Sequence, residues 1–314
     1  MFKNFHWYRL TRDLPISSTD LEEQLEKSVF NSCGDQELSR IGWVKPLGKN
    51  GASLSHCLKN ESIIILSLCK QEKILPASVI KDFVSEKVEA IEAEEDRKIH
   101  GKERASIKDD VIFELSPQAF SRFKTIYGYL DLKKGLLFVD SSTAARAEEF
   151  CSYLRKTLGS LPCIIPQVKT SPSVAMTSWL QDADQIPQGI VLGDKAVLAG
   201  SGDSAGVVRY KEQDLLGEEI ASHLQVGKQV TELQITLNDT LSAVISDDLS
   251  VKGIRLADIV TDKIAELKSE DPATEFDASM SILVEEFSEL VDKITACFGG
   301  EVPQLDAPQA DQVA

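Results

Sequence analysis

The segment Gly202-Asp203-Ser204-Ala205-Gly206 matches the pattern G-x-S-x-G, in which a serine on a tight strand-to-helix turn acts as a nucleophile. A hydrolase of this kind needs a helix directly after the turn and a histidine well downstream. Here the run VVRYKEQ after the turn alternates like a strand, and the only later histidine, His223, follows too closely. A serine hydrolase that uses Ser204 is therefore kept only as an alternative to an ordinary Gly/Ser loop.

The other polar residues give little support to metal or nucleotide chemistry. No H-E-x-x-H, G-x-x-x-x-G-K-[ST] or G-x-G-x-x-G motif occurs, and acidic pairs such as Glu94-Glu95 are typical of solvated surfaces. The four histidines, far apart in the sequence, are His6, His56, His100 and His223. The six cysteines, none of them in a C-x-x-C pair, are Cys33, Cys57, Cys69, Cys151, Cys163 and Cys297. We therefore expect buried free thiols, no catalytic residue, no metal and no cofactor.

Phosphate binding is the second kind of chemistry that the sequence offers, in the stretch Arg97 to Lys108 (RKIHGKERASIK). Five cations and one glutamate give this stretch a net charge of +4, whereas the whole chain carries −16. From Asp258 onward, 14 acidic and 3 basic residues give −11. This uneven distribution suits a protein that admits a polyanion at one surface. The alternative is a solvated helix face whose cations pair with the preceding acids, which are Glu92, Glu94, Glu95 and Asp96.

The basic stretch falls at the turn of a predicted helical hairpin. Pro76 opens a helix with apolar residues three or four apart, which at 1.5 Å per residue would project roughly 30 Å. Gly101 interrupts the pattern, and a second helix ends before Pro117. No helix-turn-helix, zinc-finger or basic-zipper pattern accompanies the hairpin, so any DNA contact should be mainly to phosphates and nonspecific.

The remaining segments predict an α+β protein with antiparallel sheets. Strands are expected at residues 5–10 and 62–68, in a hairpin over 127–139 and in three runs after residue 206, and helices are expected after Ser17, over 144–158 and over 279–298. Residues 42–51 indicate turns, and residues 166–206, rich in Pro, Gly, Ser and Asp, indicate a join between domains. No run of about 18 apolar residues and no secretory signal occurs, so we expect a cytoplasmic protein without membrane contact.

Five ordered blocks of the chain resemble the RdgC family, the bacterial recombination-associated proteins. The blocks are LEEQLEKSVFNSCGDQELSRIGWVKPLG (residues 21–48), EKILPASVI (72–80), PQAFSRF (117–123), LRKTLGSLP (154–162) and the FDAS-containing C-terminal helix region. The similarity runs from the N-terminus to about Gly300.

The resemblance implies a horseshoe-shaped subunit and a ring-shaped homodimer whose cation-lined hole can enclose duplex DNA. It implies a central α+β domain (residues 1–75 and 118–170), a helical tip or arm (76–117), a C-terminal α+β base domain (171–300) and a disordered acidic tail (301–314). Phe120 occupies the position in A-F-S-R-F whose phenylalanine enters the partner's pocket and secures the gate. The expected DNA-binding residues are Arg97, Lys98, Lys102 and Arg104 on the arm and Arg209, Lys211, Gln213 and Lys228 in the base.

The implied function is nonspecific binding of double-stranded DNA, and weaker binding of single strands, without catalysis. RdgC-like proteins limit RecA-promoted strand exchange by occupying DNA that RecA would use, and they are associated with the nucleoid. A module that binds only protein, through its acidic face, is a third possibility beside the DNA-binding ring and the hydrolase. The tail after Gly300 departs from the family pattern, and we expect it to compete with DNA for the basic surface.

Overall fold

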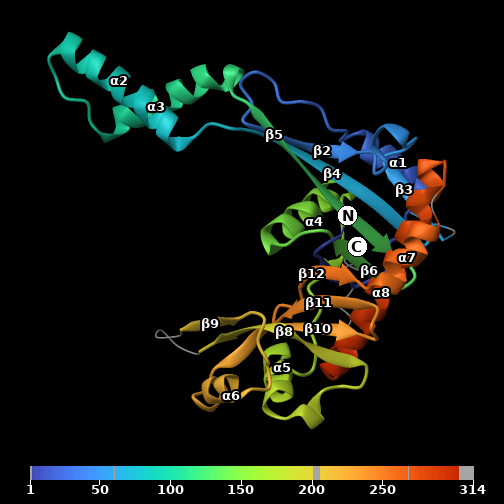
Figure 1. The fold of residues 1–314 in the computed structure, drawn as a ribbon. Helices are drawn as coiled ribbons and strands as arrows, with labels where there is room; N and C mark the ends of the chain where they lie inside the picture. Colours follow the sequence, from blue (N-terminus) through green and yellow to red (C-terminus); the bar gives the residue numbers. More distant parts are fainter. Residues whose placement is uncertain (1, 60, 201–205, 268, 304–314) are drawn as a thin grey trace, which may run out of the picture.

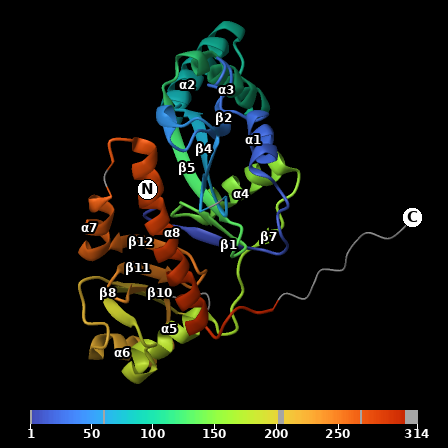
Figure 2. The same ribbon diagram turned by 90° about the vertical axis from the view of Figure 1, so that its right-hand side faces the viewer.

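The computed structural model describes residues 2–59, 61–200, 206–267 and 269–303, and this part of the chain combines two antiparallel sheets with eight α-helices (Figures 1 and 2). The strands are β1 (His6–Leu10), β2 (Ser39–Val44), β3 (Ser55–Leu58), β4 (Ile63–Lys73), β5 (Ser121–Asp131), β6 (Leu136–Val139), β7 (Cys163–Ile164), β8 (Ile190–Ala199), β9 (Val207–Tyr210), β10 (Gln229–Leu237), β11 (Leu241–Ser246) and β12 (Val251–Leu256). The helices are α1 (Ser18–Glu26), α2 (Ala77–Glu95), α3 (Gly101–Leu115), α4 (Ala144–Leu158), α5 (Pro172–Gln181), α6 (Glu218–Gln225), α7 (Asp258–Glu266) and α8 (Pro272–Cys297). The predicted α+β class is confirmed.

The first sheet has seven strands in the order β2-β4-β5-β6-β1-β7, with β3 paired to β4. Its long strand β4 alternates between two buried faces: Ile64, Leu66 and Leu68 pack with α1 and α4, whereas Ile63 and Ile65 join the core on the opposite face. A strand buried on both faces reads as a continuous apolar run, and this is why SIIILSL predicted it. The turn-rich interpretation of residues 42–51 was wrong at its start, because Gly42, Trp43 and Val44 belong to β2.

The second sheet has five strands in the order β12-β11-β10-β8-β9. Helices α5, α6 and α8 pack on one face, around buried residues such as Leu198, Leu233 and Ile245. Residues 166–206, expected to be a join between domains, contain α5 and β8 as well as the connection from β7 to the second sheet. Pro172 opens α5, because proline is well accommodated in the first turn of a helix.

The two sheets share a core through the N-terminal segment and α8. Phe5 and Val251 exchange two backbone hydrogen bonds of 2.8 and 2.9 Å, which join the start of the chain to β12. The ring of Phe287, on α8, lies 5.1 Å from that of Phe5 and 5.9 Å from that of Phe2. Helix α8 therefore buries its apolar stripe against both sheets.

Helices α2 and α3 form the predicted hairpin, which projects from the first sheet in Figure 1. We call residues 76–117 the arm. Its separate small core consists of Val84, Val88, Ile107 and Val111. Among the helices of the described residues, none is both long and apolar enough to cross a membrane.

Candidate nucleic-acid interface

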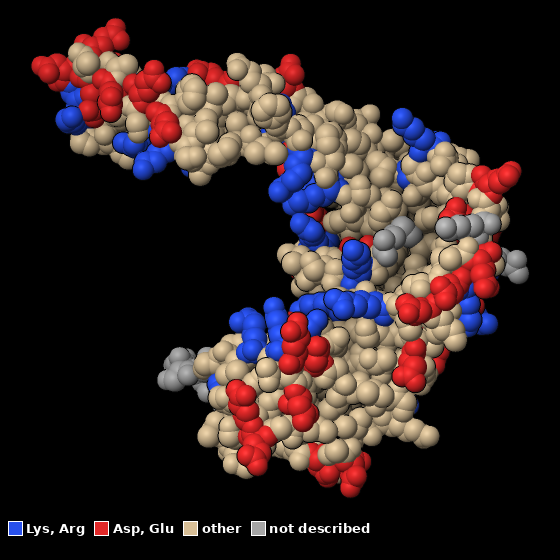
Figure 3. Space-filling view, viewed as in Figure 1, with Lys and Arg blue, Asp and Glu red and all other residues tan. Residues whose placement is uncertain are grey.

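The molecule has a concave side between the arm and the second sheet, and Lys and Arg side chains gather along it (Figure 3). Asp and Glu side chains are concentrated on the outer tip of the arm, along α8 and at the opposite end of the molecule. The net charge of −16 is therefore compatible with a locally positive surface, because the two signs are separated in space.

The open face of the second sheet brings two of the predicted residues together. On β8 and β9 side chains alternate: Ala196 and Tyr210 point into the core, whereas Lys195, Arg209 and Lys211 lie on the opposite face. These three cations line one cavity of about 260 Å³. Lys195 is a site residue that the sequence did not indicate, because the composition of residues 166–206 predicts a join and not a strand.

The same open face continues onto β12, which carries two more unpredicted cations, Lys252 and Arg255. Lys252 Nζ lies 2.8 Å from Glu232 Oε1, so one acidic group on this face is already neutralised. Within the described ranges, no carboxylate forms an ion pair with Arg209, Lys211 or Arg255. Strict alternation along VKGIRL would place Lys252 and Arg255 on opposite faces, because they are three residues apart. The irregularity in the pairing of β11 with β12 brings both to the same face.

Gln213 and Lys228 lie at the rim of this sheet. Gln213 is exposed in the turn after β9, where its backbone N–H donates to the carbonyl of Asp194 at 3.3 Å. Lys228 is half-buried just before β10, and its ammonium donates to the carbonyl of Gly206. We call the open face, namely Lys195, Arg209, Lys211, Lys252 and Arg255, the base patch, with Gln213 and Lys228 beside it.

On the arm, Arg97 and Lys98 are engaged by carboxylates. Arg97 binds Glu103, with Nη1 2.6 Å from Oε2, and also binds Glu95. Lys98 Nζ lies 2.7 Å from Glu92. The hydrogen bond from Lys98 and that from the backbone N–H of Ile99 lower the pKa of Glu92. These two cations therefore belong to a solvated surface on which neighbouring carboxylates balance their charges, which was the alternative to a DNA site.

Lys102 and Arg104 occupy the first turn of α3 and are exposed. Neither forms an ion pair with a carboxylate in the part of the chain that the structure describes. Arg104 and Lys108 line a cavity of about 430 Å³ where α2 and α3 cross, together with apolar residues of α2 such as Ile80 and Val84. The arm thus offers free cations at one end of α3 and paired cations in the turn.

A third group of cations lies between the arm and the base patch, on β4 and β5. Lys70 is directly opposite Lys124 and Glu72 is opposite Arg122 in the antiparallel register. Glu72 accepts from Arg122 at 3.0 Å and lies 3.3 and 3.4 Å from Lys70 and Lys124. The hydrogen bond from Arg122, followed by those of the two lysines, lowers the pKa of Glu72 to about 2. The sequence gives no sign of this cluster, because its members meet only across the strand pair.

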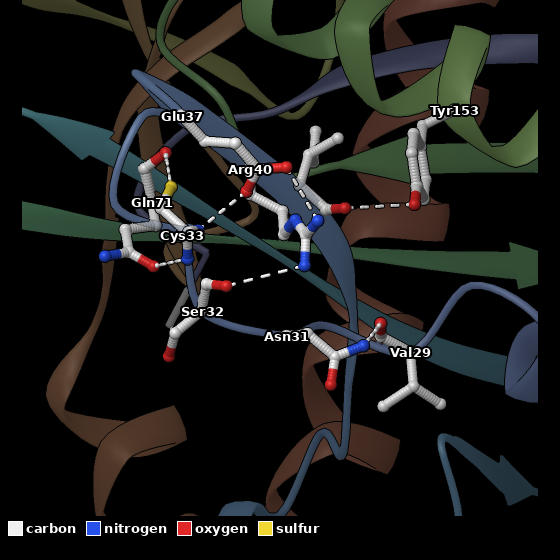
Figure 4. A network of polar contacts seen from close by, with 10 residues as sticks. Val29, Asn31, Ser32, Cys33, Glu37, Arg40, Gln71 and Tyr153 are labelled. Atoms are coloured by element: carbon white, nitrogen blue, oxygen red, sulfur yellow. Dashed lines mark hydrogen bonds and ion pairs between the residues drawn. The ribbon is translucent and has the colours of Figure 1, made fainter. Parts of the chain in front are cut away.

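Polar contacts fix the edge of the first sheet from which the arm emerges (Figure 4). The backbone N–H of Cys33 donates to Gln71 Oε1 at 2.7 Å, and Gln71 in turn donates to Ser121 Oγ at 2.8 Å. Lys73 Nζ donates to the carbonyls of Asp35 and Ser116 at 2.6 and 2.7 Å. These bonds tie the loop before β2 to both strands that lead into and out of the arm.

Phe120 stands at the exit of the arm with 85% of its surface exposed. Its backbone is fixed, since its carbonyl accepts from the N–H of Ile74 at 2.7 Å. Phe113, Phe123 and Ile74 are also exposed, each by roughly half. A large apolar side chain left this exposed on an ordered backbone marks a surface that a partner can cover.

The hydrolase alternative centres on Ser204, which lies outside the described residues. The element that follows is the strand β9 and not a helix, so the context of a nucleophile elbow does not occur there. His223 is on α6, where its ring packs 6.2 Å from that of Tyr210. In the described part of the chain, no group of three or more His, Cys, Asp and Glu side chains is arranged to hold a metal ion.

Comparison with known proteins identifies clear relatives. A family model described as "Putative exonuclease, RdgC" matches residues 1–301. The chain is 40% identical over 300 residues to the recombination-associated protein RdgC of Psychromonas ingrahamii, covering 96% of this chain and 98% of that protein. The proteins of the same name from Aeromonas hydrophila and Proteus mirabilis are 37% and 38% identical over 300 residues, with the same coverage.

Proposed function

The chain belongs to the RdgC family, and we propose that it binds duplex DNA without sequence preference, as a ring-shaped homodimer that limits the access of RecA to DNA. Its relatives are named recombination-associated proteins, and these names support a role in recombination. We propose further that it acts by occupying DNA and not by cutting it, although the family description mentions an exonuclease.

The observation that carries the proposal is the row of cations along the concave side (Figure 3). The base patch has four cations that no described carboxylate pairs with, and the arm adds Lys102 and Arg104. Phosphate contacts supply affinity that is independent of sequence and depends steeply on salt. None of these cations lies on a recognition helix or ribbon shaped for a groove, so sequence readout is not expected.

If a second copy of the chain faced the first, the two concave sides would together enclose a hole. Phe120 is exposed and could anchor such a contact. Burying an aromatic anchor contributes on the order of 2 kcal/mol. The cavity at the crossing of α2 and α3 suits it as an acceptor: Ile80, Val84 and Ala105 give apolar walls, and the stems of Lys81 and Arg104 complete them. We propose that Phe120 of each subunit enters this cavity on the partner's arm.

A gel-shift titration over a range of salt concentrations tests the function. If about six phosphates are neutralised, raising salt from 50 to 200 mM should weaken binding to a duplex by about a thousandfold. Arg209→Glu with Lys211→Glu should weaken binding to duplexes of every sequence equally and lower the salt slope. Lys263→Glu is the matched control, since Lys263 is an exposed lysine of α7 outside the base patch.

Two results would refute the proposal. An affinity for duplex that does not change with salt would exclude phosphate contacts as its source. Shortening of end-labelled DNA by the purified protein with Mg²⁺ or Mn²⁺ would show that it cuts DNA, as an exonuclease does. Binding to a RecA filament or to free RecA in the absence of accessible DNA would instead favour the protein-only module.

A further inference from the structure

Two cysteines that are separate in the sequence meet in the core of the first sheet. Cys151 lies on α4, and Cys163 is the first residue of β7, where it pairs with Leu10 of β1. Both belong to the apolar cluster that α1 and α4 form with the sheet. Their thiols lie within interaction distance of each other beside β1, and both cysteines are free.

A cation stands beside this pair. Arg155 follows Cys151 by one helical turn, so the two side chains lie on the same face of α4 and both reach Cys163. Arg155 Nη2 is 3.9 Å from Cys163 Sγ. A nearby guanidinium favours the thiolate, which is the nucleophilic form of cysteine.

The two thiols are unlike in ionisation and access. The hydrogen bond from Cys151, and next the charge of Arg155, hold the pKa of Cys163 below the usual range of a thiol. The pKa of Cys151 is raised, because it shares that hydrogen bond and is buried. Cys163 is partly exposed, whereas Cys151 is 4% exposed. This is the pattern of an attacking thiol with a resolving thiol behind it.

We infer that Cys151 and Cys163 are a peroxide-sensitive dithiol that closes into a disulfide within one chain. The Cys163 thiolate attacks one oxygen of hydrogen peroxide, and the O–O bond breaks. Hydroxide is the leaving group, and Cys163 becomes a sulfenic acid. The Cys151 sulfur then attacks the Cys163 sulfur, and the hydroxyl departs with the Cys151 proton as water. Both sulfurs are oxidised and the peroxide is reduced to water, with the hydroxide taking a proton from solvent.

The bond would join α4 to β7 across the sheet edge. Residues 165–171 lead from β7 directly to α5 on the second sheet. Oxidation would therefore fix the start of that connection to α4.

The experiment is to treat the whole reduced protein with hydrogen peroxide at pH 7, block remaining thiols with N-ethylmaleimide, and map the peptides by mass. We expect one disulfide, between Cys151 and Cys163, and four blocked cysteines. Cys163→Ser should form none, whereas Cys297→Ser, the control at a partly exposed thiol whose pKa burial raises, should form it unchanged. Arg155→Gln should slow the reaction about fivefold at pH 7, because less Cys163 is thiolate.

A disulfide between other cysteines, or none at all, would overturn the inference. A rate unchanged by Arg155→Gln would overturn the role of Cys163 as attacking thiol. A measurement on the unsubstituted chain covers the case in which Cys163→Ser does not fold. With limiting N-ethylmaleimide, Cys163 should be labelled ahead of Cys297, and equal labelling would contradict the proposal.

Discussion

The four arm cations expected to contact DNA are of two kinds. Arg97 and Lys98 are held by Glu95, Glu103 and Glu92, so each would have to exchange a carboxylate for a phosphate. Lys102 and Arg104 have no such partner within the described ranges and can contact phosphate directly. At the residue scale, the ability of a cation to contact phosphate therefore depends on whether a carboxylate already neutralises its charge.

This difference predicts unequal effects of neutral substitutions. Arg104→Gln should lower the magnitude of the slope of log K against log salt by about 1, because one phosphate contact is lost. Lys98→Gln should leave the slope nearly unchanged, since Lys98 is paired with Glu92. Titrations of a duplex at four salt concentrations measure both slopes. Equal slopes for the two variants would show that the Lys98 pair opens on DNA.

Glu72 gives a prediction about pH and stability. Its pKa in the folded protein is about 2, below the value of about 4.5 for an ordinary glutamate, so the folded state favours the carboxylate. The cluster therefore stabilises the fold fully above pH 4.5, and this contribution is lost as the pH falls toward 2. Glu72→Gln should cost about 1 kcal/mol at pH 7, allowing for screening by solvent, and almost nothing near pH 2. Urea denaturation at the two pH values would measure this, and a difference independent of pH would contradict it.

At the element scale, the arm is a helical pair with its own core. Val84, Val88, Ile107 and Val111 pack on one another and apart from the two larger clusters. The arm is tied to the rest through the strands β4 and β5 and the bonds of Lys73. We therefore expect it to open without unfolding the sheets.

Val111→Ala tests this independence. Val111 is 1% exposed, and removing its two methyl groups should destabilise the arm by about 2 kcal/mol. Amide exchange should become faster in α2 and α3 and stay unchanged in β4, β10 and α8. Phe113→Ala, at an exposed position of the same helix, is the control that should alter neither. Faster exchange throughout the molecule would mean that the arm and the sheets unfold together.

Elements with a strong local signal were predictable, and those defined by tertiary contacts were not. The ends of α2 and α3 are marked by Pro76, Gly101 and Pro117. Between them, apolar residues recur every three or four positions, as in a helix. Helices α6 and α7 have only eight and nine residues and no capping side chain, and they were not predicted. Helix α1 is as short, but the cap at Ser17 marks its start. The base patch needed the register of β8 with β9 and of β11 with β12, and no local pattern contains that register.

At the scale of the whole molecule, the tail predicted to be acidic begins with an engaged residue. Glu301 forms an ion pair with Arg9 and a bridge with Val168, and residues 304–314 lie outside the described part. Deleting 304–314 removes Asp306 and Asp311 and leaves the Arg9 pair intact. If the tail competes with DNA, this deletion should tighten duplex binding at 50 mM salt and have little effect at 200 mM, because screening weakens the competition. Unchanged affinity at low salt would end that hypothesis.

The proposed ring would need two chains, and substitutions at Phe120 test whether it forms. A closed ring on circular DNA cannot leave by sliding, so the proteins should stay on a closed circle after a salt challenge and leave once the circle is cut. Phe120→Ala should abolish this retention yet keep affinity for short linear duplexes, because the base patch is untouched.

Ala105→Trp, which fills the proposed acceptor cavity, should act in the same way, whereas Ile259→Ala, at an exposed position of α7, should not. Retention that survives both Phe120→Ala and Ala105→Trp would mean that the arms do not form the gate, and that the concave side binds DNA from one side only.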